Sequence, residues 1–264
     1  MMQSRKVRCM AKNIYFVGTA GSGKSSLVWA FQEWMTLQGL DTISVNLDPG
    51  AEYIPYEPDV DIRDWVKVEE VMKEYSLGPN GAQVVCADMM ALNAKELAEV
   101  IEGFRTNYVL IDTPGQMELF AFRQSSQVVM DILGREESYL VFLSDPALAK
   151  TPNGFVSTLM LCALTHFRFS VPFLNVLSKA DTLEEGKLEE LKTWAEDPYA
   201  LYNALTDGEF NARNIQSIEF LKAMESAGMY RELIPVSAEV QLGLEDIYNH
   251  IQLSLEGGED LRND

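Results

Sequence analysis

The sequence predicts a three-layer α/β/α fold with a mostly parallel central sheet. Short apolar runs of strand length recur along the chain, segments with helical spacing lie between them, and polar or glycine-rich motifs follow several of the runs. Strands that alternate with helices form parallel sheets covered on both faces. A length of 264 residues with 47% hydrophobic content is enough for one large core.

The apolar runs give six expected strands, and the spacing between them gives five expected helices. The strands are Asn13–Val17, Thr42–Leu47, Asn107–Ile111, Tyr139–Ser144, Pro172–Leu177 and Leu233–Val236. The helices are Lys24–Leu37, Val66–Tyr75, Ala82–Phe104, Asn153–Phe167 and Leu244–Leu255. In such sheets ligands bind beyond the carboxyl ends of the strands, so the motifs at these ends are expected to share one site.

The segment 184–230 interrupts the alternation of strands and helices. It is helical in character and longer than a connection before the last strand requires, so it is expected to be a helical insertion packed on the core. Residues 1–255 are therefore predicted to form a single domain, and residues 256–264 a flexible acidic tail.

A phosphate-binding motif follows the first expected strand. Residues Gly18–Ser25 match G-x-x-x-x-G-K-[ST], with an apolar strand before them and a helix with one apolar face after them. Glycines let backbone N–H groups converge on phosphate oxygens, and the start of the helix adds partial positive charge. Lys24 is expected to reach the β- and γ-phosphates, and the Ser25 hydroxyl to bind Mg²⁺. The residues expected to contact the nucleotide here are Gly18, Ala20, Gly21, Ser22, Gly23, Lys24, Ser25 and Ser26.

A second motif, Asp112-Thr113-Pro114-Gly115-Gln116, follows the strand Asn107–Ile111. A carboxylate in this place in a P-loop NTPase orders Mg²⁺ directly or through water. Gly115 would let a backbone N–H approach the γ-phosphate, and Gln116 would orient the attacking water. The pattern D-x-x-G is weak alone and becomes strong beside the phosphate loop.

A third motif, Ser178-Lys179-Ala180-Asp181, favours guanine as the base. The Asp181 carboxylate would accept hydrogen bonds from N1–H and the 2-amino group, which adenine does not offer. The stem of Lys179 would pack on the base. Ser178 stands where the usual GTPase pattern has asparagine, which weakens one base contact and leaves the strictness of guanine selectivity open. After the last strand, Ser237 and Ala238 resemble the final guanine-contacting element of GTPases.

Together with Gly78-Pro79-Asn80, Asn46-Leu47-Asp48-Pro49 and Asp112–Glu118, the phosphate loop makes the chain resemble the GPN-loop GTPases over nearly its whole length. The resemblance implies a homodimer in which each subunit inserts Gly78, Pro79 and Asn80 toward its partner's nucleotide. The Asn80 carboxamide would donate a hydrogen bond during hydrolysis. The resemblance places Asp48 near Mg²⁺ or the attacking water, while a turn-capping role before Pro49 is nearly as plausible.

Arginine offers no clear alternative to Asn80. Many GTPases neutralise charge on the γ-phosphate with an arginine finger. Arg63, Arg105 and Arg123 could serve, but nothing in the sequence marks them. The residues expected to take part in catalysis are Lys24, Asp48, Asn80, Asp112 and Gln116, and those expected to bind metal are Ser25, Asp48 and Asp112.

The composition narrows the classes of partner. A formal net charge of −19 repels nucleic-acid phosphates and anionic lipid surfaces, so neither nucleic acid nor membrane is an expected partner. The 3 cysteines are scattered and the 2 histidines stand apart, which argues against a zinc site or a histidine-based triad and for a reducing compartment. Without a signal peptide or a membrane-length apolar run, a cytoplasmic location is expected.

The sequence thus predicts a Mg²⁺-dependent GTPase that converts GTP to GDP and acts as a conformational switch or assembly factor. The alternative is a nucleotide-gated chaperone that binds an apolar client at the helical insertion, with hydrolysis secondary; the apolar residues there could equally form the insertion's own core. A nucleotide kinase lacks its arginine-rich lid here. A dimeric ATPase with a second lysine early in its phosphate loop is disfavoured by Thr19 and Ala20.

Overall fold

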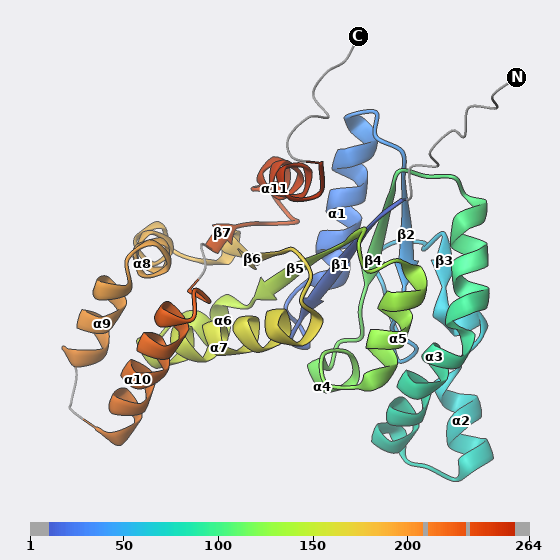
Figure 1. Ribbon diagram of the computed structural model, residues 1–264, viewed down its shortest axis with the longest axis horizontal. Helices are drawn as coiled ribbons and strands as arrows, with labels where there is room; N and C mark the ends of the chain where they lie inside the picture. Colours follow the sequence, from blue (N-terminus) through green and yellow to red (C-terminus); the bar gives the residue numbers. More distant parts are fainter. Residues whose placement is uncertain (1–10, 208–210, 231–232, 257–264) are drawn as a thin grey trace, which may run out of the picture.

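The computed structural model describes residues 11–207, 211–230 and 233–256, and its centre is a seven-stranded sheet (Figure 1). The order is β3-β2-β4-β1-β5-β6-β7, and each pair of neighbouring strands is parallel. The strands are β1 (Lys12–Gly18), β2 (Thr42–Asn46), β3 (Val60–Asp61), β4 (Tyr108–Asp112), β5 (Ser138–Ser144), β6 (Phe173–Leu177) and β7 (Leu233–Pro235). The predicted parallel sheet is confirmed.

Helices cover both faces of this sheet. Helices α1 (Lys24–Leu37) and α11 (Leu244–Glu256) pack on one face, where Ile14 and Phe16 of β1 point. Helices α3 (Pro79–Gly103), α5 (Gln124–Leu133) and α7 (Pro152–Phe169) cover the other face, to which Tyr15 and Val17 contribute. Successive side chains of a strand point to opposite faces, so an uninterrupted apolar strand supplies both layers of the core. The three-layer prediction is confirmed.

The sheet topology brings the predicted motifs to one edge. Strand β1, which leads into the phosphate loop, lies between β4 and β5. Phe16 on β1 and Asn46 on β2 are both aligned with Asp112, the last residue of β4. Because the strands are parallel, the loops after β1, β2 and β4 leave the sheet side by side, which is where open α/β folds bind ligands.

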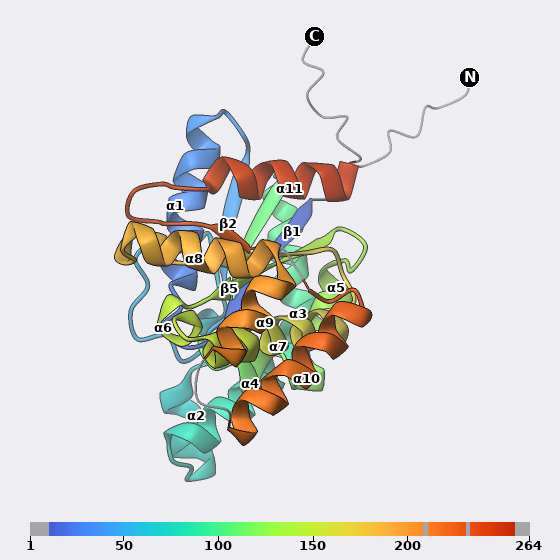
Figure 2. The ribbon, with the colours of Figure 1, turned by 90° about the vertical axis from the view of Figure 1, so that its left-hand side faces the viewer.

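The predicted insertion holds helices α8 (Glu185–Glu196), α9 (Pro198–Thr206) and α10 (Ala212–Ser226), which lie together in front of α7 (Figure 2). They share an apolar cluster with α7, in which the rings of Phe155 and Trp194 meet edge to face at 5.7 Å. Leu221 and Met224 are buried in this cluster, whereas Phe220 is exposed. Phe210 lies outside the described residues, as does the tail after Glu256, which itself ends α11.

Several element bounds differ from the prediction. Strand β3, the short helices α4 (Met117–Phe120) and α6 (Pro146–Ala149), and the longer α5 were not expected. Helix α2 (Val68–Tyr75) begins two residues later than expected, and α3 begins at Pro79 instead of Ala82. Proline suits the first turn of a helix because its missing N–H would have no partner there. Gly78, Pro79 and Asn80 are therefore the N-terminus of α3 and not a free loop.

Within the described part of the chain, no helix combines the length and apolar character that a membrane crossing requires.

Candidate functional site

The loop after β1 is shaped by glycines. Gly21 and Gly23 have φ of +74° and +91°, a left-handed backbone that favours glycine. At Gly18, an added Cβ would lie 2.7 Å from Ser22 Oγ and 2.8 Å from the Leu143 carbonyl oxygen of β5. The loop is therefore packed too tightly to accept a side chain at Gly18. At Gly21 and Gly23, a side chain would strain the backbone because of its left-handed conformation.

Lys24 is buried beneath the loop that is expected to bind phosphate. Its ammonium donates hydrogen bonds to the carbonyl oxygens of Gly18 (3.0 Å) and Thr19 (2.9 Å). Burial lowers the pKa of Lys24, while the carboxylates of Asp112 and Asp48 act to raise it. A cation held by neutral carbonyls near two carboxylates is suited to exchange these partners for phosphate oxygens. Around it, Ser22 is buried, Ser25 is half-buried, and Ala20, Gly21 and Ser26 are exposed.

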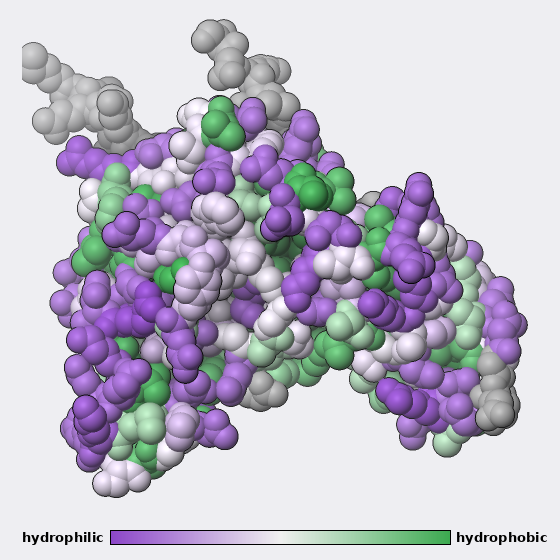
Figure 3. All heavy atoms as spheres, turned by 180° about the vertical axis from the view of Figure 1, so that it is seen from behind, coloured by the Kyte–Doolittle hydropathy of each residue, from purple (hydrophilic) through white to green (hydrophobic). Residues whose placement is uncertain are grey.

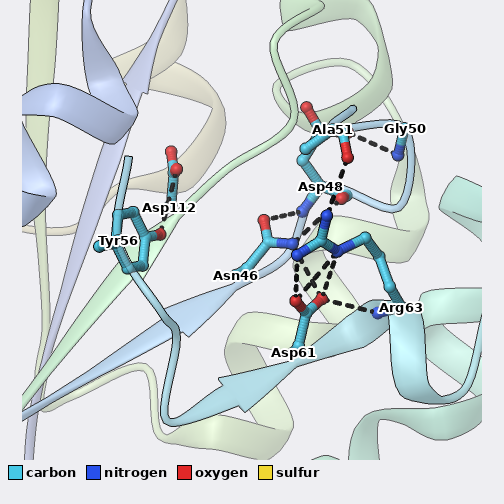
Figure 4. A network of polar contacts seen from close by, with 8 residues as sticks. All are labelled: Asn46, Asp48, Gly50, Ala51, Tyr56, Asp61, Arg63 and Asp112. Atoms are coloured by element: carbon cyan, nitrogen blue, oxygen red, sulfur yellow. Dashed lines mark hydrogen bonds and ion pairs between the residues drawn. The ribbon is translucent and has the colours of Figure 1, made fainter. Parts of the chain in front are cut away.

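Asp112 ends β4 instead of following it, and it is 2% exposed. Its Oδ2 accepts a hydrogen bond of 3.2 Å from the Tyr56 hydroxyl (Figure 4). Its Oδ1 is buried and has no hydrogen-bond partner among the described residues. Burial raises the pKa of Asp112 to about 6, although Ser25, Lys24 and Tyr56 favour the charged form. An unsatisfied buried carboxylate oxygen is costly, so it indicates a place for a further ligand.

The donor set around Asp112 fits Mg²⁺. A carboxylate and the neighbouring Ser25 hydroxyl are hard oxygen ligands, and Mg²⁺ in nucleotide sites keeps few protein ligands beside phosphates and water. The described residues contain no group of three or more His, Cys, Asp or Glu side chains that could hold a metal ion by themselves.

Asp48 joins two of the predicted motifs. Its Oδ1 accepts a hydrogen bond of 2.9 Å from the Gly50 backbone N–H, which is the turn-capping role. Its Oδ2 accepts another of 3.0 Å from the Gly115 N–H. The Gly115 N–H that was expected to face the γ-phosphate is thus engaged by Asp48 here. Asp48 both caps its own turn and holds the loop after β4.

A polar network fixes the chain between β2 and β3 (Figure 4). Asn46 donates to Asp61 at 2.9 Å, and Arg63 donates from Nε to both Asp61 carboxylate oxygens and from Nη1 to the Ala51 carbonyl at 3.0 Å. Burial acts to raise the pKa of Asp61, but hydrogen bonds from Arg63 and Asn46 hold it below its usual value. Arg63 is therefore committed to a structural role.

Arg123 and Arg105 also lie away from the phosphate loop or are engaged by other residues. Arg123 pairs with Asp88 of α3, with Nε 2.9 Å from Oδ1. Arg105 lines a cavity of about 690 Å³ next to Asn13 and Thr106, at the amino ends of β1 and β4 and hence opposite the phosphate loop. None of the three lines the pocket that joins the phosphate loop to the third motif.

That pocket, of about 290 Å³, brings together three segments far apart in the sequence. It is lined by Gly23, Ser26, Leu27, Ser178, Lys179, Asp181, Val236, Ala238 and Glu239. Ser178 is buried and donates to the Ser144 carbonyl at 3.2 Å, and Ser237 is buried. The third motif, Ala238 after β7 and the end of the phosphate loop thus line one space.

Lys179 ties this pocket to the phosphate loop. Its ammonium donates to the Gly21 carbonyl and lies 3.1 Å from Asp145 Oδ2. Its stem packs against Gly23, where an added Cβ would be 3.5 Å from Lys179 Cε. Asp145, which caps α6, was not singled out by the sequence analysis because nothing local in the sequence connects it with Lys179.

Gln116 and the start of α3 lie on the exposed side of the site. Gln116 Nε2 donates a hydrogen bond of 2.9 Å to Gln83 Oε1, on α3. Gly78, Pro79 and Asn80 are all exposed, and an added Cβ at Gly78 would meet nothing within 4 Å. The structure therefore connects Gln116 to the helix that begins with these residues while leaving the residues themselves accessible. Gln83 and Tyr56 were also missed by the sequence analysis, since neither belongs to a motif.

Comparison with known proteins shows the family of this chain. The profile of a family described as "Conserved hypothetical ATP binding protein" matches residues 16–257. The GPN-loop GTPase PAB0955 of Pyrococcus abyssi is 34% identical over 243 residues, which make up 89% of this chain and 93% of that protein. The chain belongs to the GPN-loop GTPases. The crystal structure titled "a GTPase in Apo form", also of PAB0955, has a TM-score of 0.83 at 31% identity and covers 94% of this chain and 98% of that one.

Other GPN-loop GTPases match over part of their length. GPN-loop GTPase 2 of Schizosaccharomyces pombe is 36% identical over 170 residues, which are 63% of this chain and 54% of that protein. The chain thus spans about half the length of that relative. The resemblance seen in the motifs is confirmed as family membership, and the fold class with it.

Proposed function

We propose that this GPN-loop GTPase hydrolyses GTP to GDP and phosphate with Mg²⁺, as a homodimer whose subunits each present Gly78, Pro79 and Asn80 to the partner's nucleotide. The observation that carries the proposal is the pocket shared by the phosphate loop and the third motif. Gly23 and Ser26 bound it on one side and Asp181 on the other, so a base in it would continue directly from phosphates held by the loop.

The phosphate end works by exchange of hydrogen-bond partners. On binding, Lys24 would transfer its hydrogen bonds from the Gly18 and Thr19 carbonyls to β- and γ-phosphate oxygens. Ser25 and Asp112, with Asp48 close by, would hold Mg²⁺, which neutralises charge on these oxygens. A γ-phosphate would compete with Asp48 for the Gly115 N–H, which would free the Asp48 carboxylate to orient the attacking water together with Gln116.

The base end selects by hydrogen bonding. The Asp181 carboxylate accepts from two donors on guanine that adenine lacks, and a site built to pair with such donors rejects analogues without them. Lys179 lines the same pocket, and its ammonium is held by the Gly21 carbonyl and the Asp145 carboxylate. The Ser178 hydroxyl donates its hydrogen bond to the Ser144 carbonyl. Ser178 would therefore support the wall of the pocket and make no side-chain contact with the base.

The dimer proposal rests on accessibility. Asn80 is exposed at the start of α3. Within the same subunit, this helix is linked to Gln116 by the hydrogen bond between Gln116 and Gln83. Arg63 and Arg123 are held by carboxylates, so neither is free to stabilise the γ-phosphate within the subunit. A neutral amide supplied by a second copy would add a donor where charge develops, without a further cation.

A mixing experiment tests the arrangement in trans. Lys24→Ala removes phosphate binding from one kind of subunit, and Asn80→Ala removes the amide from the other, so each homodimer should be slow. A heterodimer contains one site with an intact loop facing an intact Asn80. Random pairing should therefore restore about a quarter of the wild-type rate.

The control is Asn93→Ala, on the same helix, where the side chain donates along the helix to the Met89 carbonyl. This variant should hydrolyse GTP as the wild type does. Molecular mass measured on the same samples verifies that mixed dimers form. Slow hydrolysis in verified heterodimers would contradict the trans arrangement, and normal turnover in the Asn80→Ala homodimer would remove its catalytic role.

The helical insertion favours a further role as a conformational switch that binds an apolar client. Tyr199, Ile215 and Phe220 are exposed on α9 and α10, whereas Leu221 and Met224 are used in the insertion's own core. From behind, the surface is hollowed between the lobe of α2 and that of the insertion, and hydrophobic residues are interspersed among hydrophilic ones (Figure 3). Binding of an apolar dye should differ between complexes with a GTP analogue and with GDP, and less so in Phe220→Ser; equal binding in both states would contradict this role.

A further inference from the structure

Gln83 occupies a junction between three segments of the site. It lies on α3, one helical turn after Asn80, and its Oε1 accepts the hydrogen bond of 2.9 Å from Gln116 Nε2. These two residues are 33 positions apart in the sequence. The contact links the loop after β4 to the start of α3.

The other end of the Gln83 amide lies against the loop after β2. A Cβ added to Gly50 would be 3.0 Å from Gln83 Nε2 and 3.4 Å from Asp48 Oδ1. Gly50 also donates its N–H to Asp48, whose second carboxylate oxygen holds Gly115, the residue before Gln116. The absence of a side chain at Gly50 thus allows the Gln83 amide to sit beside the Asp48 turn.

We propose that Gln83 is a positioning residue that holds the Gln116 amide in the orientation needed for hydrolysis and couples it to the N-terminus of α3. The inference rests on the proposed function, in which Gln116 orients the attacking water. With its nitrogen engaged by Gln83, Gln116 keeps its carbonyl oxygen as the group that can accept a hydrogen bond from that water. Gln83 itself touches neither substrate nor reacting atoms in this role.

The coupling has a physical basis in the helix. Asn80 and Gln83 are three residues apart and share the first turns of α3, so they move as one unit. Contact of a second copy with Asn80 would restrain α3, and through Gln83 it would also restrain Gln116. Formation of the dimer would in this way order the residue that positions the water in the same subunit.

The test separates positioning from binding. Gln83→Met keeps the length of the side chain and removes the acceptor. We expect kcat to fall about 3- to 10-fold, as for the loss of one partly exposed hydrogen bond, with KM for GTP, affinity for GDP and molecular mass unchanged. Gln83→Glu keeps an acceptor oxygen and should recover most of the lost turnover. Val84→Ala, at the next and exposed position of α3, is the control and should leave kcat unchanged.

Gly50→Ala offers a second way to displace the same amide, because its Cβ would approach Gln83 Nε2 to 3.0 Å. It should lower kcat, and in combination with Gln83→Met it should cause no further loss. In a Gln116→Ala background, Gln83→Met should have no effect, because the group that it positions is gone.

The outcomes distinguish this inference from the proposed function. Unchanged turnover in Gln116→Ala would overturn the role given to Gln116. Slow turnover in Gln116→Ala with normal turnover in Gln83→Met would overturn only the role of Gln83. An undiminished effect of Gln83→Met in the Gln116→Ala background would also overturn it, since Gln83 would then act elsewhere.

Discussion

The two halves of the phosphate site are built in different ways. The phosphate loop is one continuous segment, Gly18–Ser25, whose shape comes from glycines and whose cation bonds to the loop's own carbonyls. The other half, which is proposed to face the γ-phosphate, is assembled from three segments that meet through side chains. Asp48 reaches Gly115 across 67 residues of sequence, and Tyr56 reaches Asp112 across 56.

This difference separates a rigid element from an adjustable one. Backbone packed against a strand, as at Gly18, has no alternative arrangement of similar energy. Side-chain hydrogen bonds such as Asp48 to Gly115 and Gln116 to Gln83 can be exchanged individually at a cost of about 1 kcal/mol each. The continuous loop is therefore expected to bind phosphate in a fixed way, and the assembled half to respond to it.

The largest effect should come from Gly18→Ala. Its Cβ would clash with Ser22 Oγ at 2.7 Å and with backbone at 2.8 Å, so we expect at least a 100-fold loss of nucleotide affinity or failure to fold, as for overpacking at a rigid site. Gly78→Ala, where nothing lies within 4 Å, should change the free energy of unfolding by less than about 0.5 kcal/mol. Calorimetric binding and urea unfolding measure both. Equal tolerance at the two glycines would remove the contrast between the halves.

Asp181→Asn should change the choice of base. An amide nitrogen at this position suits a carbonyl at C2 of the base, as in xanthine, and no longer accepts from the guanine N1–H and 2-amino group. We expect a roughly 10- to 100-fold shift in the ratio of GTP to XTP turnover, for exchange of one or two hydrogen bonds. Competition between the two nucleotides gives the ratio, and ATP serves as the reference. A ratio that does not move would show that the pocket near Asp181 does not hold the base.

Asp112→Asn should stabilise the metal-free, nucleotide-free protein. Burial raises the pKa of Asp112 from 3.8 to about 6, so the folded protein binds this proton more tightly than the unfolded chain. Its contribution to stability is therefore present below pH 4 and lost as the pH rises through about 6. At about pH 8 the variant should gain about 1–3 kcal/mol in the free energy of unfolding, and about half of this at pH 5.

Urea unfolding at the two pH values measures this gain, and hydrolysis of GTP in Mg²⁺ should be lost in the same variant. A destabilised Asp112→Asn protein at high pH would contradict the picture of an uncompensated carboxylate at the junction of the two halves.

The smallest effect should come from Tyr56→Phe, which removes one hydrogen bond of the assembled half and leaves the phosphate loop untouched. We expect a change of about 0.5–1.5 kcal/mol in the free energy of unfolding. The pKa of Asp112 should rise further, because the Tyr56 hydroxyl favours its charged form. Titration of that carboxyl by NMR in both proteins checks the direction. A pKa that stays the same or falls in the variant would contradict the stabilisation of the Asp112 carboxylate by Tyr56.

Sequence reasoning succeeded where structure is local. Helix α1 has the bounds predicted for it, and the motifs at Gly18, Asp112 and Lys179 lie at strand ends that parallel topology must bring together. It failed for β3, whose two residues carry no periodicity and which is held beside β2 by Asn46 and Asp61. Gln83, Tyr56 and Asp145 were missed for the same reason. Their roles depend on partners distant in sequence, and the identity of a side chain alone does not predict which residue it will contact.

Lys179 joins the phosphate loop to the neighbouring pocket, because its ammonium contacts the Gly21 carbonyl and the Asp145 carboxylate while the residue lines the pocket. Fragments of the nucleotide should consequently fail to add up. Guanosine alone and triphosphate alone would each have to shift the same lysine from these contacts, whereas the intact nucleotide shifts it once. The free energy of binding GTP should thus exceed the sum of the fragment values by more than the entropy of joining them, and Lys179→Ala should abolish that surplus.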